Sequence, residues 1–120
     1  WLGRRVVILD GDEMRETISL GAGFSQEERE IHNLRVARLA QSMATQGFLV
    51  IVSVIAPFAS TRAKIQEICT PQWVYMKKER TQSEEIYPYE VPTDPILTLD
   101  TDELSSEETF HKFSEWLSRV

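Results

Sequence analysis

The sequence predicts a three-layer α/β domain in which a mainly parallel sheet carries helices on both faces. Two observations lead to this prediction. Short, continuously apolar segments of strand length alternate along the chain with longer segments whose apolar residues recur at helical spacing. Strand–helix–strand order favours parallel pairing, because the crossover helix packs back onto the sheet. With 120 residues, the chain is expected to form a single domain over residues 1–120.

The first half of the chain contains two predicted strands and two predicted helices. Residues 5–9 are expected to form a strand, because residues 6–9 are continuously apolar, and the run FLVIVSVIAP is expected to form another. Both strands are therefore expected to be buried. Ser25 and Glu28 have the spacing of a capping box, which predicts a helix start, and Gly47 is expected to end this helix at the C′ position. Ser60 is expected to cap a second, shorter helix.

The second half is predicted to add two strands and a final helix. QWVYM and ILTLD have strand composition, and the segment 77–95 between them carries three prolines that exclude a regular element. Ser105 and Glu108 form a second capping box at the start of the last helix. The residues expected to lie in the core here are Cys69, Trp73, Phe110, Phe113 and Trp116.

Composition argues against several classes of function. The net charge of −6 makes nucleic acid an unsuitable partner, and no apolar segment approaches the length needed to span a membrane. A single cysteine cannot form an internal disulfide, which favours a reducing, cytoplasmic location. His32 and His111 are far apart and have no cysteine at metal-ligand spacing, so a zinc site is not expected.

Charged side chains gather where the first predicted strand ends. Asp10 and Asp12 flank a glycine directly after the apolar run, and Arg15 follows three residues later. Ligands of open parallel sheets bind beyond the carboxyl ends of the strands, where the segment 53–58 is also expected to lie. Asp10 is suitably placed to hold a Mg²⁺-bound water or to accept a proton from a hydroxyl. Asp12 is either a site residue or the N-cap of a short helix.

Arginines supply the positive charge that an anionic ligand would need at this edge. Arg15, Arg29 and Arg62 offer planar, bidentate donors for phosphate or sulfate oxygens. Arg29 lies in the first turn of its predicted helix, where unpaired backbone N–H groups add to the positive field.

Six segments occur in the order and spacing of adenylylsulfate kinases, and the resemblance covers nearly the whole chain. They are LDGDEMR, GFSQEER, HNLRVARLA, IVSVIAPF, PYEVP and LDTDELSSEE. The resemblance implies a P-loop kinase fold. It also implies transfer of the ATP γ-phosphoryl group to the 3′-hydroxyl of adenosine 5′-phosphosulfate, with Mg²⁺ accompanying ATP and no covalently bound cofactor. The product would be 3′-phosphoadenosine 5′-phosphosulfate, the activated sulfate donor.

The resemblance also implies roles for individual residues. Asp10 would be the catalytic acid near the metal and the accepting hydroxyl, and Arg15 and Arg29 would hold the phosphosulfate. Phe24 would stack on the substrate adenine. The other implied substrate-binding positions are His32, Asn33, Ile55 and Pro57.

Several positions depart from the family pattern. The family usually has asparagine where this chain has His32, and Asn33 follows directly, so either residue is a candidate for the polar role. Ala56 replaces a serine and Ala59 replaces an arginine in the segment after the second strand. Members of the family have a long, lysine-rich lid segment before PYE, and this segment is shorter here. Its candidate remnants are Lys77, Lys78 and Arg80. These residues are equally typical of an ordinary charged, solvent-exposed segment.

The largest departure concerns ATP. Nothing in the sequence matches G-x-x-x-x-G-K-[ST], the loop whose amides and lysine hold ATP phosphates. We therefore expect either a fragment of a complete kinase, inactive alone, or a kinase-derived domain that binds nucleotide for regulation. A P-loop kinase for another small hydroxylated substrate shares the fold and stays open. Adenosine 5′-phosphosulfate and ATP are the implied ligands, and the resemblance allows a homodimer or a fusion to ATP sulfurylase.

Overall fold

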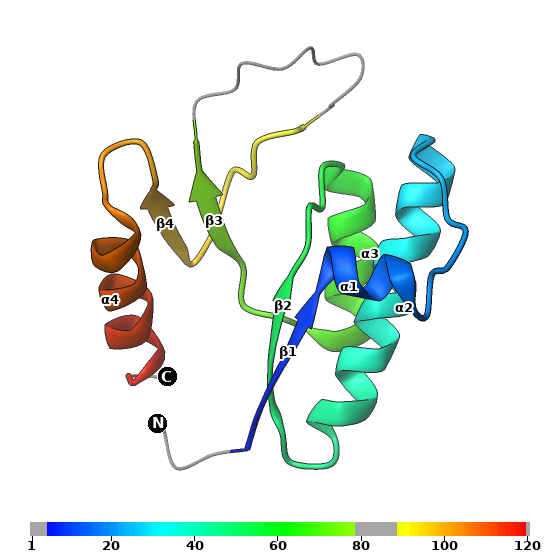
Figure 1. Ribbon diagram of the computed structural model, residues 1–120, viewed down its shortest axis with the longest axis horizontal. Helices are drawn as coiled ribbons and strands as arrows, with labels where there is room; N and C mark the ends of the chain where they lie inside the picture. The colour runs from blue at the N-terminus through cyan, green and yellow to red at the C-terminus, as the bar shows by residue number, and fades with distance from the viewer. Residues whose placement is uncertain (1–4, 79–88, 120) are drawn as a thin grey trace. The chain divides into compact units, whose positions relative to one another are not determined.

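The computed structural model describes residues 5–78 and 89–119 (Figure 1). These residues belong to two compact units, one ending at Pro71 and the other beginning at Gln72. Each unit contains one pair of parallel strands together with helices. Within the described ranges, no helix is both long enough and apolar enough to cross a membrane.

The first unit is built on a parallel strand pair. Its elements in chain order are β1 (Val6–Asp10), α1 (Gly11–Glu16), α2 (Gln26–Ala44), β2 (Leu49–Ser53) and α3 (Ala59–Cys69). Helix α2 packs against both β2 and α3 (Figure 1). The strand–helix–strand order therefore gives the parallel pairing that the sequence predicted, with α2 in the crossover between the strands.

One face of this strand pair carries the core of the first unit. Leu9 of β1 packs with Val36 and Ala40 of α2, and all three are buried. Side chains alternate between the faces of a strand, so Val6 and Ile8 point to the other face, where they are 43% and 64% exposed. The expectation that both strands are fully buried is therefore wrong, because α2 covers only one face of the pair.

Side-chain caps fix the first residues of two helices. The Ser25 hydroxyl accepts a hydrogen bond from the Glu28 N–H at 3.1 Å, so α2 begins where the sequence predicted. Helix α1 is capped by Asp10, whose Oδ2 accepts from the Glu13 N–H at 3.2 Å. The alternative cap at Asp12 is wrong, because Asp12 already lies inside the first turn.

Two helix boundaries differ from the predicted ones, and a third has an unusual backbone conformation. Helix α3 begins after Phe58, which makes no side-chain cap, so the expected cap at Ser60 is wrong and Ser60 lies inside the helix. Thr45 is the C-cap of α2, and Gly47, with φ of +93°, follows two residues later rather than at C′. At the C-cap of α3 the left-handed conformation falls on Thr70, with φ of 46°. This conformation is costly for a β-branched residue.

The second unit has a second parallel strand pair and the last helix. Strands β3 (Val74–Lys77) and β4 (Leu97–Asp100) pair along their lengths, and α4 (Ser106–Leu117) follows β4 and packs on it. Both halves of the predicted capping box are present. The Ser105 hydroxyl accepts from the Glu108 N–H at 3.1 Å, and Glu108 Oε1 accepts from the Ser105 N–H at 3.0 Å. The hydrogen bonds from Ser105 lower the pKa of the Glu108 carboxyl.

The aromatic residues of α4 are less buried than predicted. Phe113 and Trp116 are partly buried and lie with their ring centroids 5.9 Å apart. Phe110 is 70% exposed, so its assignment to the core is wrong. Cys69 and Trp73 are also only partly buried, and burial raises the pKa of the Cys69 thiol.

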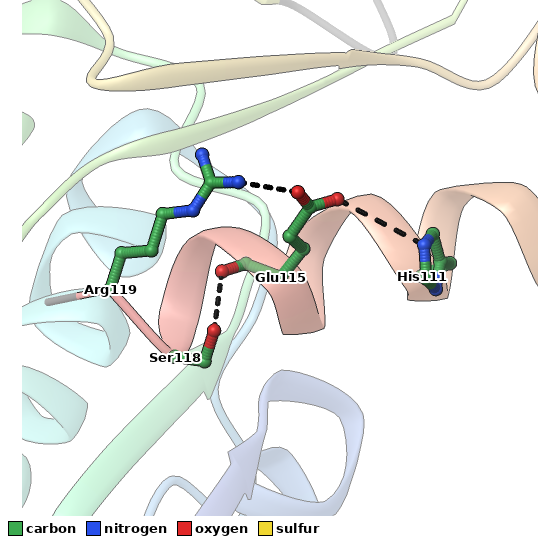
Figure 2. Close-up of polar contacts among 4 residues, drawn as sticks. All are labelled: His111, Glu115, Ser118 and Arg119. Carbon is green, nitrogen blue, oxygen red and sulfur yellow. Dashed lines mark hydrogen bonds and ion pairs between the residues drawn. The ribbon is translucent and has the colours of Figure 1, made fainter.

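Figure 2 shows the polar contacts at the end of α4, where Glu115 lies between two basic side chains one helical turn away on either side. Arg119 Nη2 approaches Glu115 Oε1 at 2.5 Å, and His111 Nε2 lies 3.9 Å from Glu115 Oε2. The Ser118 hydroxyl donates to the Glu115 carbonyl at 2.7 Å. These side chains are exposed, so their pairs contribute little to stability.

Candidate functional site

Strands β1 and β2 end side by side. Asp10 pairs with Ser53 in the parallel register. Gly11 then lies directly against the chain after β2, because a Cβ added there would be 3.1 Å from Val54 Cγ1 and 3.3 Å from the Ser53 carbonyl oxygen. This confirms the expectation that the segment 53–58 follows the same edge as the acidic residues. Glycine at position 11 permits the close approach.

The Asp10 carboxylate is held by the backbone of α1. Its Oδ2 accepts a hydrogen bond from the Glu13 N–H, and none of the described residues donates a hydrogen bond to its Oδ1. Among the described residues, no three His, Cys, Asp or Glu side chains converge as they would in a metal cage. A single carboxylate with an uncommitted oxygen suits a magnesium ion whose other ligands are waters and phosphate oxygens.

Phe24, Arg15 and Arg29 form a cluster beside this edge, and we name it the aromatic–arginine cluster. The guanidinium carbon of Arg15 lies 4.3 Å from the centroid of the Phe24 ring, and that of Arg29 lies 5.6 Å from it. Phe24 is nevertheless 67% exposed. Both distances are within the range of a cation–π interaction, so two elements, α1 and α2, hold cations around one accessible ring.

Backbone hydrogen bonds fix both arginines to the loop that carries Phe24. Arg15 Nη1 donates to the carbonyls of Ala22 and Gly23 at 3.4 and 3.1 Å. Arg29 Nε donates to the Phe24 carbonyl at 2.7 Å. A guanidinium has five N–H donors, so these bonds orient Arg15 and leave it further donors for a ligand. An exposed aromatic face beside two oriented cations is suited to a base that carries an anionic group.

The Glu28 side chain folds back over Gly23. A Cβ at position 23 would lie 1.8 Å from Glu28 Oε2, so a larger residue there would require this carboxylate to move. Glu28 is exposed and its side chain is flexible, so the loop that carries Phe24 can keep its path.

His32 and Asn33 are both buried, at 3% exposure each, and they differ in their contacts. Asn33 Nδ2 donates to the Ile55 carbonyl at 3.2 Å, which ties α2 to the segment after β2. His32 Nδ1 has no hydrogen-bond partner among the described residues. Burial, followed by the charges of Arg15 and Arg35, lowers the pKa of His32 from 6.5, so its imidazole is neutral near neutral pH.

The segment after β2 presents one apolar side chain and buries the next two residues. Ile55 is 74% exposed, whereas Ala56 and Pro57 are buried. Arg62 Nη1 donates to the Ala56 carbonyl at 2.5 Å and holds this segment against the start of α3. Ile55 is therefore available to a ligand, whereas the buried side chain of Pro57 is not.

Two polar residues of the first unit were missed in the sequence. Arg35 Nη1 donates to the Ile18 carbonyl at 3.4 Å, and its charge acts on His32. Ser19, in the loop after α1, is fully buried, and its hydroxyl has no hydrogen-bond partner among the described residues. Arg35 lies three residues after His32, which places both on one face of a helix. This spacing was the feature of the sequence from which Arg35 could have been identified.

The lid candidates belong to the second unit. Lys77 is the last residue of β3, and its Nζ lies 3.8 Å from Asp100 Oδ2. Lys78 is exposed, and Arg80 lies outside the described residues. Beyond the undescribed stretch, Tyr89 stacks on Tyr75 with ring centroids 6.1 Å apart. A lid role for these cations stays a prediction.

The chain is similar in sequence to known proteins. The sequence profile of the adenylylsulphate kinase family matches residues 2–89. A probable adenylyl-sulfate kinase of Aeropyrum pernix is 34% identical over an alignment covering 83% of this chain and 69% of that protein. An adenylyl-sulfate kinase of Deinococcus deserti is 31% identical, with 88% of this chain and 71% of that protein covered.

The fold of the chain is similar to that of a solved structure. The hexameric APS kinase from Thiobacillus denitrificans superposes with a TM-score of 0.79 at 27% identity, over 98% of this chain and 23% of that chain. The predicted α/β fold with parallel strands is therefore confirmed, and it is the P-loop kinase fold. The chain belongs to the adenylylsulfate kinase family.

Proposed function

We propose that this chain forms the acceptor-nucleotide site of an adenylylsulfate kinase and binds adenosine 5′-phosphosulfate through the aromatic–arginine cluster. The observation that carries the proposal is the pair of guanidiniums, from Arg15 and Arg29, held around the exposed face of Phe24. Phe24 would stack on the adenine, and the two arginines would bind the oxygens of the phosphosulfate. The exposed Ile55 would add apolar contact to the nucleotide.

Asp10 is the residue that we assign to the reacting hydroxyl. Its position at the carboxyl end of β1, with Oδ2 fixed by the Glu13 N–H, supports a role in orienting the 3′-hydroxyl and accepting its proton. Bound with ATP, Mg²⁺ would neutralise charge on the transferring phosphoryl group. The single uncommitted oxygen of Asp10 would hold this ion through a water.

For the complete kinase we propose transfer of the ATP γ-phosphoryl group to the 3′-hydroxyl, giving 3′-phosphoadenosine 5′-phosphosulfate. For the chain printed here we propose binding without useful turnover. The sequence contains no loop of the type that holds ATP phosphates, and phosphoryl transfer depends on positioning and charge neutralisation. A regulatory, nucleotide-binding role for such a chain follows from the same observation and is the second candidate.

The partners of the complete protein are also proposed rather than established. The hexamer of the Thiobacillus denitrificans relative makes self-association a reasonable expectation for this chain. A fused sulfurylase, the single domain over residues 1–120 and a cytoplasmic location stay predictions.

A calorimetric titration with adenosine 5′-phosphosulfate tests the proposed site. The Arg29→Ala variant is expected to bind about 10- to 100-fold more weakly, as the loss of a charge-assisted hydrogen bond implies. Arg38→Ala is the matched control, because Arg38 is an exposed arginine of the same helix. Equal losses in the two variants would contradict the assignment of Arg29. ATP-dependent product formation by the pure chain would contradict the proposal that it does not turn over.

A further inference from the structure

The segment between β2 and α3 passes the candidate site without belonging to a helix or strand. Residues 54–58 have no regular structure, and Ile55 among them is 74% exposed while Ala56 and Pro57 are buried. Backbone groups of such a segment have no regular ladder of hydrogen bonds, so they need other partners. Side chains of two neighbouring helices supply partners here.

Two consecutive carbonyls of this segment accept hydrogen bonds from side chains. Asn33 Nδ2 of α2 donates to the Ile55 carbonyl at 3.2 Å, and Arg62 Nη1 of α3 donates to the Ala56 carbonyl at 2.5 Å. Asn33 is 3% exposed, so water competes little for its donor. The bond from Arg62 is charge-assisted and therefore belongs to the stronger class. We name Asn33 and Arg62 the carbonyl clamp.

The residue before Ile55 is held from a third side. A Cβ added to Gly11, at the start of α1, would be 3.1 Å from Val54 Cγ1 and 3.3 Å from the Ser53 carbonyl oxygen. Ser53 also pairs with Asp10 in the strand register. Three helices therefore contact three successive residues of the segment, and these contacts fix the Ile55 backbone relative to the end of β1, where Asp10 lies.

An exposed apolar side chain on a backbone fixed in this way is suited to an apolar surface of a ligand. Little further ordering is needed when a ligand covers Ile55, because the backbone is already held. Covering this side chain removes apolar area from water, which strengthens binding. The two clamp side chains need not touch the ligand for this effect, since they act through the backbone of the segment.

We propose that Asn33 and Arg62 are positioning residues, which hold Ile55 in place for the nucleoside part of the bound nucleotide. This inference rests on the proposed function for the identity of the ligand, and it goes further by giving Arg62 a role inside the protein. A direct bond from Arg62 to the phosphosulfate is the alternative that the sequence suggested. The two roles differ in which part of the ligand is affected when Arg62 is replaced.

Titration of Arg62→Gln with adenosine and with adenosine 5′-phosphosulfate separates these roles. If Arg62 acts through Ile55, both ligands are expected to bind roughly 3- to 10-fold more weakly, because the lost hydrogen bond affects the nucleoside contact that they share. The advantage of the phosphosulfate over the plain nucleoside then stays the same. Lys64→Gln is the matched control, since it removes an exposed cation from the same helix, and its affinities should equal those of wild type. A loss confined to adenosine 5′-phosphosulfate would overturn the inference.

A double-mutant cycle with Ile55→Ala tests whether the clamp acts through that side chain. Ile55→Ala alone is expected to weaken adenosine binding about 5- to 30-fold, and its exposed position is one where the fold tolerates substitution. Adding Arg62→Gln or Asn33→Ala to this variant should weaken binding by less than about twofold further. A general loss of structure would instead weaken both backgrounds equally. Equal effects in the two backgrounds, or unchanged affinity in Ile55→Ala, would overturn the inference.

The wild-type chain gives a readout that needs no variant. Hydrogen exchange of the Asn33 side-chain amide, followed by NMR, is expected to be slow already in the free chain. Adenosine should slow it no further, because the clamp is formed before the ligand binds. Protection that arises only with the ligand would overturn the inference even if Asn33→Ala and Arg62→Gln did not fold.

Failure of the proposed function would give different results. Adenosine binding with the coupled pattern, but without any gain from the phosphosulfate, would support the clamp and overturn adenosine 5′-phosphosulfate as the ligand. Binding of adenosine 5′-phosphosulfate with additive losses would overturn the inference and leave the nucleotide site standing. Absence of binding of either ligand to the folded wild-type chain would overturn both.

Discussion

The guanidinium of Arg15 is fixed to the loop whose aromatic ring it contacts. Its carbon lies 4.3 Å from the Phe24 centroid, and its Nη1 donates to the carbonyl of Gly23, the residue before that ring. The ring is therefore held in place on its loop while most of its surface stays accessible. Pre-orientation of this kind lowers the entropic cost of binding a planar ligand.

Phe24→Ala is expected to weaken nucleotide binding without unfolding the chain. Stacking of a base on an aromatic residue is worth about 1–3 kcal/mol, which corresponds to a loss of roughly 5- to 150-fold in affinity. Isothermal titration with adenosine 5′-phosphosulfate measures the effect. Phe110→Ala is the control, because Phe110 is similarly exposed but belongs to the second unit. Unchanged affinity in Phe24→Ala would exclude the stacking role.

Asn33→Ala is expected to destabilise the first unit. Asn33 is buried and donates to the Ile55 carbonyl, so the variant leaves that carbonyl without this bond at a cost of about 1–3 kcal/mol. Urea unfolding measures the change. Gln41→Ala, at an exposed position of the same helix, should change stability by less than about 0.5 kcal/mol. Similar losses of stability in the two variants would show that the hydrogen bond from Asn33 to the Ile55 carbonyl does not contribute measurably to the stability of the fold.

Thr70→Gly is expected to stabilise the chain by about 0.5–1 kcal/mol. Thr70 is the C-cap of α3 with φ of 46°, where glycine avoids the strain that a β-branched residue has. Thermal unfolding gives the change in stability. Thr45→Gly is the matched control, because Thr45 caps α2 with φ of −65°, where threonine is unstrained. Only the substitution at position 70 should raise the melting temperature.

His32 is expected to make stability depend on pH. Its pKa is lowered in the folded chain from an ordinary value of 6.5, so the unfolded chain binds a proton more readily. The contribution of the neutral imidazole is fully present above pH 6.5 and is lost as the pH falls through the lowered folded value. Urea unfolding between about pH 5 and about pH 7.5 should show this decline in wild type and in His111→Asn, and a smaller one in His32→Asn. An identical decline in all three proteins would assign it to other groups.

The sequence predicted those parts of the fold that depend on short-range chemistry. The capping box at Ser105 and the helix start at Ser25 were identified because a hydroxyl and an acid three residues apart act locally. The burial of the strands was predicted less well. An apolar run such as VVIL reads the same whether one face or both are covered, and Ile8 is exposed.

Some site residues were predicted better than others, because some of their contacts depend on tertiary packing. The resemblance named Arg15, Phe24 and Arg29, and the structure brings these three together, although their roles stay predictions. It could not separate His32 from Asn33, because the difference lies in which neighbour each side chain meets across α1, α2 and the Ile55 segment. Such contacts depend on tertiary packing, which the spacing of residues along one helix does not report.

A thermodynamic cycle tests the central claim, that Arg15 recognises the phosphosulfate of a nucleotide stacked on Phe24. The affinities of adenosine and of adenosine 5′-phosphosulfate are measured for wild type and for Arg15→Ala. The account predicts that the phosphosulfate strengthens binding to wild type by at least about tenfold, and that this advantage largely disappears in Arg15→Ala. Equal weakening of both ligands by the substitution, or no binding of either ligand to the folded wild-type chain, would contradict it.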